Sequence, residues 1–122
     1  MIWRRVRVSG ETTLADWLGD KLPRLRLFDG PGGAFDRDLV EVGGALLVVS
    51  QCTLSGDARK GRRPNFGAAA GAAEAEALYD RLVARLRAAG HAVETGVFGG
   101  RMALELVNDG PVTLVVDGEA GA

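Results

Sequence analysis

A polar stretch that follows a continuous apolar run holds the groups best suited to chemistry. Ser50, Gln51, Cys52 and Thr53 supply hydroxyl, amide and thiol groups where residues 45–50 end. Functional groups are often mounted in this way, at the exit of a rigid element. A hydroxyl needs a neighbouring base to act as a nucleophile, and no base adjoins Thr53 in the sequence. The pattern therefore favours Thr53 as a positioning group and Cys52 as a small buried apolar residue rather than a nucleophile.

A Gly-Pro step near the C-terminus is the second candidate. Gly110 and Pro111 separate residues 102–107 from residues 112–116, and both flanking runs have the composition of strands. Proline fixes its own φ and restricts the residue before it, while glycine has no Cβ to block an approaching molecule. The step therefore predicts a turn that presents two backbone carbonyls in a fixed orientation.

A loop at residues 55–66 carries four cations within five positions, Arg59, Lys60, Arg62 and Arg63. Such a run is either a solvated loop or a site that binds phosphates by charge. Residues 3–8 leave a similar choice, because alternating arginines fit either an edge strand with a solvated face or a basic binding strip.

Metal and cofactor chemistry has no signature in the sequence. His91 is the only histidine and follows a predicted helix, where a capping or exposed role is expected. No spacing of candidate ligands fits a metal, and the glycine-rich residues 30–33 lack the following helix that nucleotide-binding loops require. We therefore predict neither a metal nor a cofactor.

Size and composition are those of one domain that spans residues 1–122. The net charge of −1 excludes a globally basic nucleic-acid-binding protein but not a local basic patch. A single cysteine leaves no internal disulfide and fits a reducing cytoplasm. Neither a signal peptide nor an apolar run of membrane-spanning length is visible, so we expect a cytoplasmic protein with no membrane contact.

The hydrophobic periodicity predicts a mixed α/β fold (α+β) with two main helices. The first covers residues 14–22, with Thr12 or Thr13 as its cap and Pro23 at its end; the second covers residues 72–89 and ends at Gly90. Residues 29–33 are predicted to be a loop and residues 39–42 one helical turn. Strands are expected at residues 3–8, 25–28, 45–50, 93–97, 102–107 and 112–116, and the apolar strand 45–50 is expected to be buried on both faces.

These blocks together resemble the D-aminoacyl-tRNA deacylase family. Ser50-Gln51-Cys52-Thr53-Leu54 is similar to its S-Q-F-T-L motif, and residues 108–113 match its second motif, N-x-G-P-V-T. The intervening blocks at residues 61–66, 78–79 and 95–102 occur in the family's order and spacing, so the resemblance covers roughly residues 17–116.

The resemblance implies a homodimeric, β-barrel-like α/β fold with the active site at the subunit interface. The implied activity is hydrolysis of the ester that joins a D-amino acid, or glycine, to the 3′ end of tRNA. In the family the Gly-Pro bond is cis and enters the partner's pocket, where its carbonyls meet the substrate's α-amino group and exclude an L side chain. Much of the chemistry is left to backbone groups and to the terminal 2′-hydroxyl of the tRNA.

Site residues carried over from the resemblance fall into three groups. The catalytic group is Ser50, Gln51 and Thr53. The substrate-binding group is Cys52, Phe98, Met102, Asn108, Gly110, Pro111 and Thr113. The candidates for tRNA phosphates are Arg59, Lys60, Arg62 and Arg63.

The chain departs from the family pattern at its start and at two internal positions. Cys52 stands where the family has phenylalanine, and Phe35-Asp36 stands where Met-Asn is common. The family opens with several strands that have no full counterpart here, so we expect a sheet that is incomplete at the N-terminus. The alternative function is therefore a shortened, catalytically weak or inactive paralogue that binds RNA or forms dimers without turnover.

Overall fold

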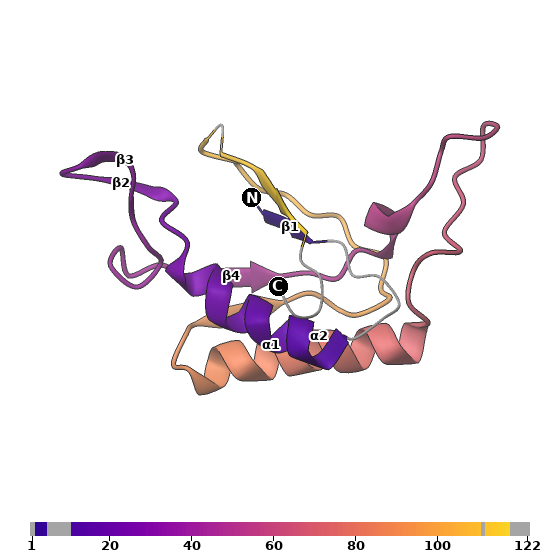
Figure 1. Cartoon of the computed structure of the whole chain (residues 1–122), viewed down its shortest axis with the longest axis horizontal. Coiled ribbons are helices and arrows are strands. Elements are labelled where there is room, and N and C mark those ends of the chain that lie inside the picture. The colour runs from indigo at the N-terminus through magenta and orange to yellow at the C-terminus, as the bar shows by residue number, and fades with distance from the viewer. Residues whose placement is uncertain (1, 5–10, 111, 118–122) are drawn as a thin grey trace.

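Two helices that run in the same direction form the base of the structure, a computed structural model that describes residues 2–4, 11–110 and 112–117. Helix α1 spans Glu11–Lys21 and α2 spans Ala72–Ala88. In Figure 1 they lie side by side along one edge of the molecule, with the short strand β4 (Leu46–Val48) next to them. The predicted mixed α/β fold with two main helices is confirmed.

The bounds of α2 follow from its sequence. Apolar residues recur at helical spacing, Glu74 lies in the first turn, and Arg85 and Arg87 lie in the last, as the helix dipole favours. The buried face of α2 carries Val83 and Leu86, and Leu86 is fully buried. Burying a side chain of this size contributes about 1.5–3 kcal/mol, so this face anchors the fold.

Helix α1 differs from its predicted start. It begins at Glu11, so Thr12 and Thr13 lie inside its first turn and the predicted threonine cap is wrong. As expected, the α-helix ends before Pro23, which is buried in the 3₁₀ turn η1 (Leu22–Arg24). The apolar side chains Leu14, Ala15 and Leu18 are buried between the helices and the rest of the molecule.

Three pairs of short strands stand in place of one closed barrel among the described residues. Strand β4 pairs in parallel with β5 (Val93–Thr95), and β1 (Ile2–Arg4) pairs in parallel with β6 (Leu114–Val116). Strands β2 (Phe28–Gly30) and β3 (Gly33–Arg37) form an antiparallel hairpin. The expected sheet is therefore present as three separate two-stranded sheets among the described residues. Residues 5–8 of the first predicted strand lie outside the described residues.

Four expectations about strands and turns are corrected. The predicted loop at residues 29–33 contains the turn of the β2–β3 hairpin, in which the amide of Gly32 donates to Oδ2 of Asp36 at 3.0 Å. Residues 25–27 precede that hairpin and are not part of a strand. Strand β4 is not buried on both faces, since Leu47 is 56% exposed. Residues 102–107 form no strand.

The small core lies where α2 meets the β4–β5 pair. Val83, Leu86 and Val93 form the buried cluster, and Val48 and Tyr79 are half-buried against it. Residues 39–43 form hydrogen-bonded turns rather than a regular helix, with Leu39 buried. No helix in the described parts of the chain combines the length and apolar character needed to cross a membrane.

Candidate functional site

Strand β4 leads directly into the predicted polar stretch. Its exit is held by Tyr79 of α2, whose hydroxyl donates to the carbonyl oxygen of Val48 at 2.8 Å. The Tyr79 ring lies 5.9 Å from the Phe98 ring, centroid to centroid, with a tilt of 48°. Pairs with this spacing attract through their ring quadrupoles. Tyr79 therefore joins α2, the end of β4 and the segment that carries Phe98, a positioning role that the sequence reasoning missed.

A 3₁₀ turn, η2 (Cys52–Ser55), follows β4 and orients the next side chains. Gln51 caps this turn, and its Oε1 accepts the Thr53 hydroxyl at 2.6 Å and the Thr53 amide at 3.4 Å. The Thr53 hydroxyl thus gives its proton to a neutral amide oxygen, which is too weak a base to activate a nucleophile. This geometry supports a positioning role for Thr53.

Cys52 is exposed, which contradicts its interpretation as a buried apolar residue. The reason is local, because the chain leaves β4 before this position and turns into η2 at the surface. Cys52 lines the mouth of the adjoining cavity together with Ser50 and Gln51.

An apolar cavity of about 340 Å³ lies between α1, α2 and the end of β4. Four predicted site residues line it and are thus brought together, namely Ser50, Gln51, Cys52 and Phe98. Its remaining wall is mostly aliphatic, from Leu14 and Leu18 of α1, Leu78 and Leu82 of α2, and residues 46–49. The arrangement suits a ligand that presents both an apolar body and a polar end.

Met102 lies close to this region. Its Sδ accepts the amide of Val97 at 3.4 Å. A Cβ built on Gly96 would be 3.0 Å from the Met102 sulfur and 3.5 Å from Cγ1 of Val49. Met102 therefore covers the backbone of Gly96 beside the end of β4 and does not line the cavity.

The Gly-Pro motif forms a second locus. The Asn108 side-chain amide donates to the hydroxyl of Thr113 at 3.2 Å and so ties together the two ends of the motif. Gly110 lies at a bend and is exposed, and Pro111 lies outside the described residues. A Cβ on Gly110 would come within 2.5 Å of the backbone nitrogen of Val112, so only glycine fits this bend without a shift of the backbone.

The two loci do not meet within the chain. None of the described residues of the Gly-Pro motif lines the cavity. In Figure 1 the turn before β6 stands well away from η2, on the other side of the β1–β6 pair. The predicted residues therefore group as Ser50, Gln51, Cys52 and Phe98 around the cavity, with Thr53 and Met102 beside it, and as Asn108, Gly110 and Thr113 at the distant turn.

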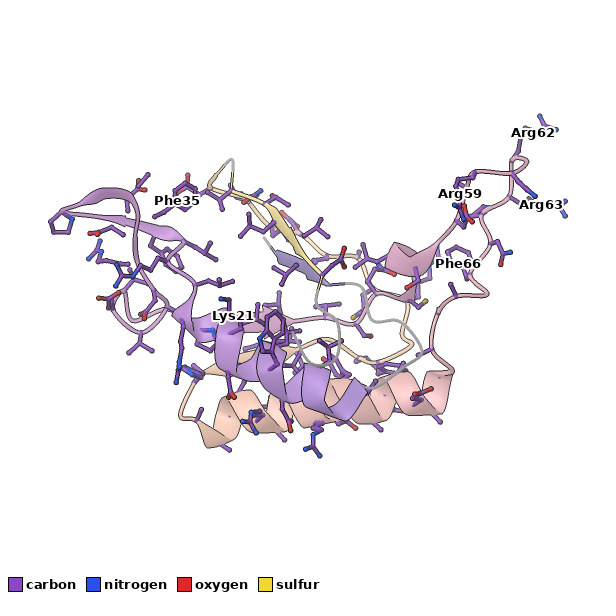
Figure 2. The ribbon with its side chains drawn as sticks, in the orientation of Figure 1. Lys21, Phe35, Arg59, Arg62, Arg63 and Phe66 are labelled. Carbon is purple, nitrogen blue, oxygen red and sulfur yellow. The ribbon has the colours of Figure 1, made fainter. Side chains whose placement is uncertain are left out.

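The basic loop is a third locus, directly after η2. Arg59, Lys60, Arg62 and Arg63 are all exposed, and Figure 2 shows Arg62 and Arg63 at its far end. Oδ1 of Asp57 accepts the Nε of Arg59 at 2.8 Å, and this side-chain hydrogen bond holds the pKa of Asp57 below its usual range. No group of three or more His, Cys, Asp or Glu residues that could hold a metal ion occurs within the described chain.

Comparisons with known proteins give one consistent picture. A family model described as D-Tyr-tRNA(Tyr) deacylase matches residues 4–117. The chain is 54% identical over 105 residues to a D-aminoacyl-tRNA deacylase of Symbiobacterium thermophilum, covering 86% of this chain and 70% of that one. It is 51% identical over 112 residues to a protein of the same name from Thermomicrobium roseum, covering 92% of this chain and 73% of that one.

A solved structure agrees with these relatives. The c-Myc DNA Unwinding Element Binding Protein superposes with a TM-score of 0.79 at 26% identity, over 91% of this chain and 76% of that one. The family match includes both the polar exit of β4 and the Gly-Pro turn, the two loci that the sequence singles out. This chain belongs to the D-aminoacyl-tRNA deacylase family.

Proposed function

We propose that this protein is a tRNA-editing esterase that hydrolyses the ester of D-aminoacyl-tRNA and glycyl-tRNA and rejects L-aminoacyl-tRNA. The main support for this proposal is the match to the family model over residues 4–117. This range includes both motifs. Relatives with about half of their residues identical are named D-aminoacyl-tRNA deacylase.

The site supports hydrolysis through positioning rather than covalent catalysis. Thr53 donates its proton to Gln51 and acts as a positioning group in this proposal. Water attacks the ester carbon, the bond to the 3′ oxygen breaks, and the proton lost by water is taken up by that oxygen. The terminal 2′-hydroxyl of the tRNA assists the departure of the 3′ oxygen. The aliphatic cavity beside Ser50 and Gln51 accommodates the apolar face of the aminoacyl-adenosine end, with its ester directed to the polar mouth.

Chiral selection is assigned to the Gly110-Pro111 step. Backbone carbonyls at this step bind the α-amino group, and an L side chain would collide with the backbone that a D side chain avoids. The hydrogen bond between Asn108 and Thr113 stabilises the turn, and the absence of a Cβ at Gly110 keeps the approach open.

The site is completed by a homodimer in this proposal. Within one chain the described residues of the Gly-Pro motif do not line the cavity, which supports insertion of the motif into the cavity of a partner subunit. The segment before the motif offers an apolar surface for such a partner, since Leu104 is 59% and Val107 92% exposed. Covering such a surface is a general driving force for association.

The direct test is incubation of the protein with D-tyrosyl-tRNA, L-tyrosyl-tRNA and glycyl-tRNA, followed by measurement of the remaining ester. We expect hydrolysis of the D and glycyl esters at rates at least about a hundredfold above that of the L ester, because a steric and polar mismatch of this kind is worth several kcal/mol. Equal rates for the D and L esters, or no hydrolysis of any ester, would reject the proposal.

A paralogue that binds RNA or dimerises without turnover is the second candidate. It is favoured by one observation, that β4 pairs only with β5 among the described residues and leaves its other edge uncovered. An open edge lowers the rigidity of the strand that carries the polar groups. Binding of tRNA without hydrolysis in the same assay would support this candidate.

A further inference from the structure

The basic loop is built as a finger with a defined neck. We call residues 57–65 the basic finger. Asp57 and Asn65 exchange both backbone hydrogen bonds, at 2.7 and 2.8 Å, and so close the neck as an antiparallel bridge. The Asn65 side chain then accepts the amide of Gly67 at 2.8 Å. The residues between these positions are therefore a projection with fixed ends rather than a loose connection.

The neck of the finger contacts the turn that carries Thr53. The amide of Gly56 donates to the carbonyl of Thr53 at 3.0 Å, at the end of η2. The Phe66 ring lies against the backbone of Gly56, where an added Cβ would be 2.8 Å from Cε1 of the ring. The finger thus starts from a defined position beside Thr53.

The four cations of the finger are not equivalent. Arg59 folds back onto Asp57, which accepts its Nε at 2.8 Å and its backbone amide at 3.0 Å, while a terminal nitrogen of the guanidinium lies 2.5 Å from Oδ2. This bidentate pair occupies the Nε edge of the planar guanidinium, which is one of the edges that could otherwise bind a phosphate. Arg59 is therefore part of the neck.

The other three cations of the finger have no side-chain partner among the described residues. Lys60, Arg62 and Arg63 are exposed and make no hydrogen bond or ion pair with the described part of the chain. Gly61 sits between them with a φ of +71°, a conformation that turns the chain at the tip. Figure 2 shows the side chains of Arg62 and Arg63 directed away from the body of the molecule. Three neighbouring positive charges produce a local positive potential that attracts anions.

We propose that Lys60, Arg62 and Arg63 bind the phosphate backbone of the tRNA 3′ strand, upstream of the terminal adenosine, while the Asp57–Arg59 pair braces the finger. The inference rests on the proposed function, because it takes the aminoacyl ester to lie beside Thr53. An extended chain rises about 3.3 Å per residue, so the tip reaches on the order of 10 Å from the neck, toward phosphates that precede the terminal nucleotide. Phosphate contacts set register without reading sequence, so the finger serves different tRNAs alike.

The test is equilibrium binding of deacylated tRNA to the full chain, measured at several KCl concentrations. Each phosphate contact contributes about 0.7–0.9 to the slope of log affinity against log salt. The Lys60→Gln/Arg62→Gln/Arg63→Gln variant should lose about two units of slope, with affinity at low salt lowered on the order of tenfold to a hundredfold. Arg59→Gln should leave the slope unchanged.

A matched control removes the same charge elsewhere. Lys21, Arg24 and Arg26 are exposed at and beyond the end of α1, and Figure 2 places Lys21 away from the finger. The Lys21→Gln/Arg24→Gln/Arg26→Gln variant should keep the wild-type slope, and the melting temperature of each variant reports whether the fold is intact. Equal losses in the two triple variants would mean that only net charge matters, and would overturn the proposal.

Two outcomes test the phosphate-binding role of the finger and the esterase activity independently of each other. In the first outcome, the wild-type protein hydrolyses D-aminoacyl-tRNA, and the triple variant of the finger keeps the wild-type salt dependence of tRNA binding and the wild-type KM. The phosphate-binding role of the finger is then wrong, while the esterase activity is confirmed. In the second outcome, the triple variant lowers the salt dependence of tRNA binding, but the wild-type protein hydrolyses no ester. The phosphate-binding role of the finger is then confirmed, while the proposed esterase activity is wrong. Absence of tRNA binding by the wild-type protein contradicts the inference, and so does a loss of about 0.7–0.9 units of slope in Arg59→Gln, the share expected of one phosphate contact.

Discussion

The hydroxyl of Thr53 donates to Oε1 of Gln51 across 2.6 Å, within a single turn of chain after β4. This short contact fixes the two side chains relative to each other beside the cavity, which Gln51 lines. Because its proton is engaged by Gln51, the Thr53 hydroxyl has its lone pairs left to accept a hydrogen bond from a donor group.

Replacement of Thr53 by alanine should lower the rate of D-ester hydrolysis about fivefold without abolishing it, because one hydrogen bond is worth roughly 1 kcal/mol. Single-turnover hydrolysis of D-tyrosyl-tRNA measures the effect. Thr53→Ser, which keeps the hydroxyl, should recover most of the rate. Isolation of a covalent aminoacyl-Thr53 species would show that Thr53 attacks the substrate and that the positioning role is wrong.

Replacement of Gly110 by alanine should sharply reduce hydrolysis of D-esters while the helical base stays folded. The added Cβ would meet the backbone nitrogen of Val112 at 2.5 Å, so the turn must shift. Helical circular dichroism and hydrolysis of the D and L esters report the two effects separately. Gly71→Ala is the control, since a Cβ there meets no atom within 4 Å. Full activity with full rejection of L-esters in Gly110→Ala would remove the selective role of this turn.

Replacement of Tyr79 by phenylalanine should lower stability by about 1 kcal/mol, because it removes the hydrogen bond to the Val48 carbonyl and leaves that half-buried oxygen without this partner. The ring contact with Phe98 is kept. We expect kcat to fall more than KM changes, since the exit of β4 loses its anchor. Urea unfolding and steady-state hydrolysis check both parts, and Phe98→Leu isolates the ring contact. An unchanged kcat would limit Tyr79 to a role in stability.

The two helices should separate more easily in acid. Arg81 donates two hydrogen bonds to Asp16 and Arg85 two to Asp20, and these bonds hold the pKa of each carboxyl below its usual range. Because the pKa is lower in the folded chain, the unfolded chain takes up more protons as the pH falls below about 4. The contribution of these pairs is therefore complete at neutral pH and is lost progressively below that value.

Comparison of the wild-type protein with Asp16→Asn/Asp20→Asn by urea unfolding tests this dependence. The difference in unfolding free energy at pH 7 should shrink at pH 3, and also in high salt, because the pairs are partly exposed. Asp80→Asn, a change on the exposed face of α2, should show no such trend. A difference that stays constant from pH 7 to pH 3 would mean that the pairs do not act through charge.

Local sequence determined the helices and the positions of the polar groups. The periodicity, charges and terminal glycine of the second helix predicted residues 72–89, and α2 spans Ala72–Ala88. A helix makes its hydrogen bonds within its own segment, so nearby residues are enough to specify it. The exit of β4 and the motif at residues 108–113 were likewise visible in the sequence, because each is a short run of neighbouring residues.

Only the tertiary structure decided which segments meet. Residues 102–107 alternate like a strand but have no strand partner among the described residues, whereas residues 28–37 form a hairpin that the loop composition concealed. The exposure of Cys52, the contact from Tyr79 to Val48 and the withdrawal of Arg59 onto Asp57 were also invisible in the sequence. A strand satisfies its backbone only by pairing with another segment, and a side chain finds its partner only after the chain has turned, so neither can be read from one stretch alone.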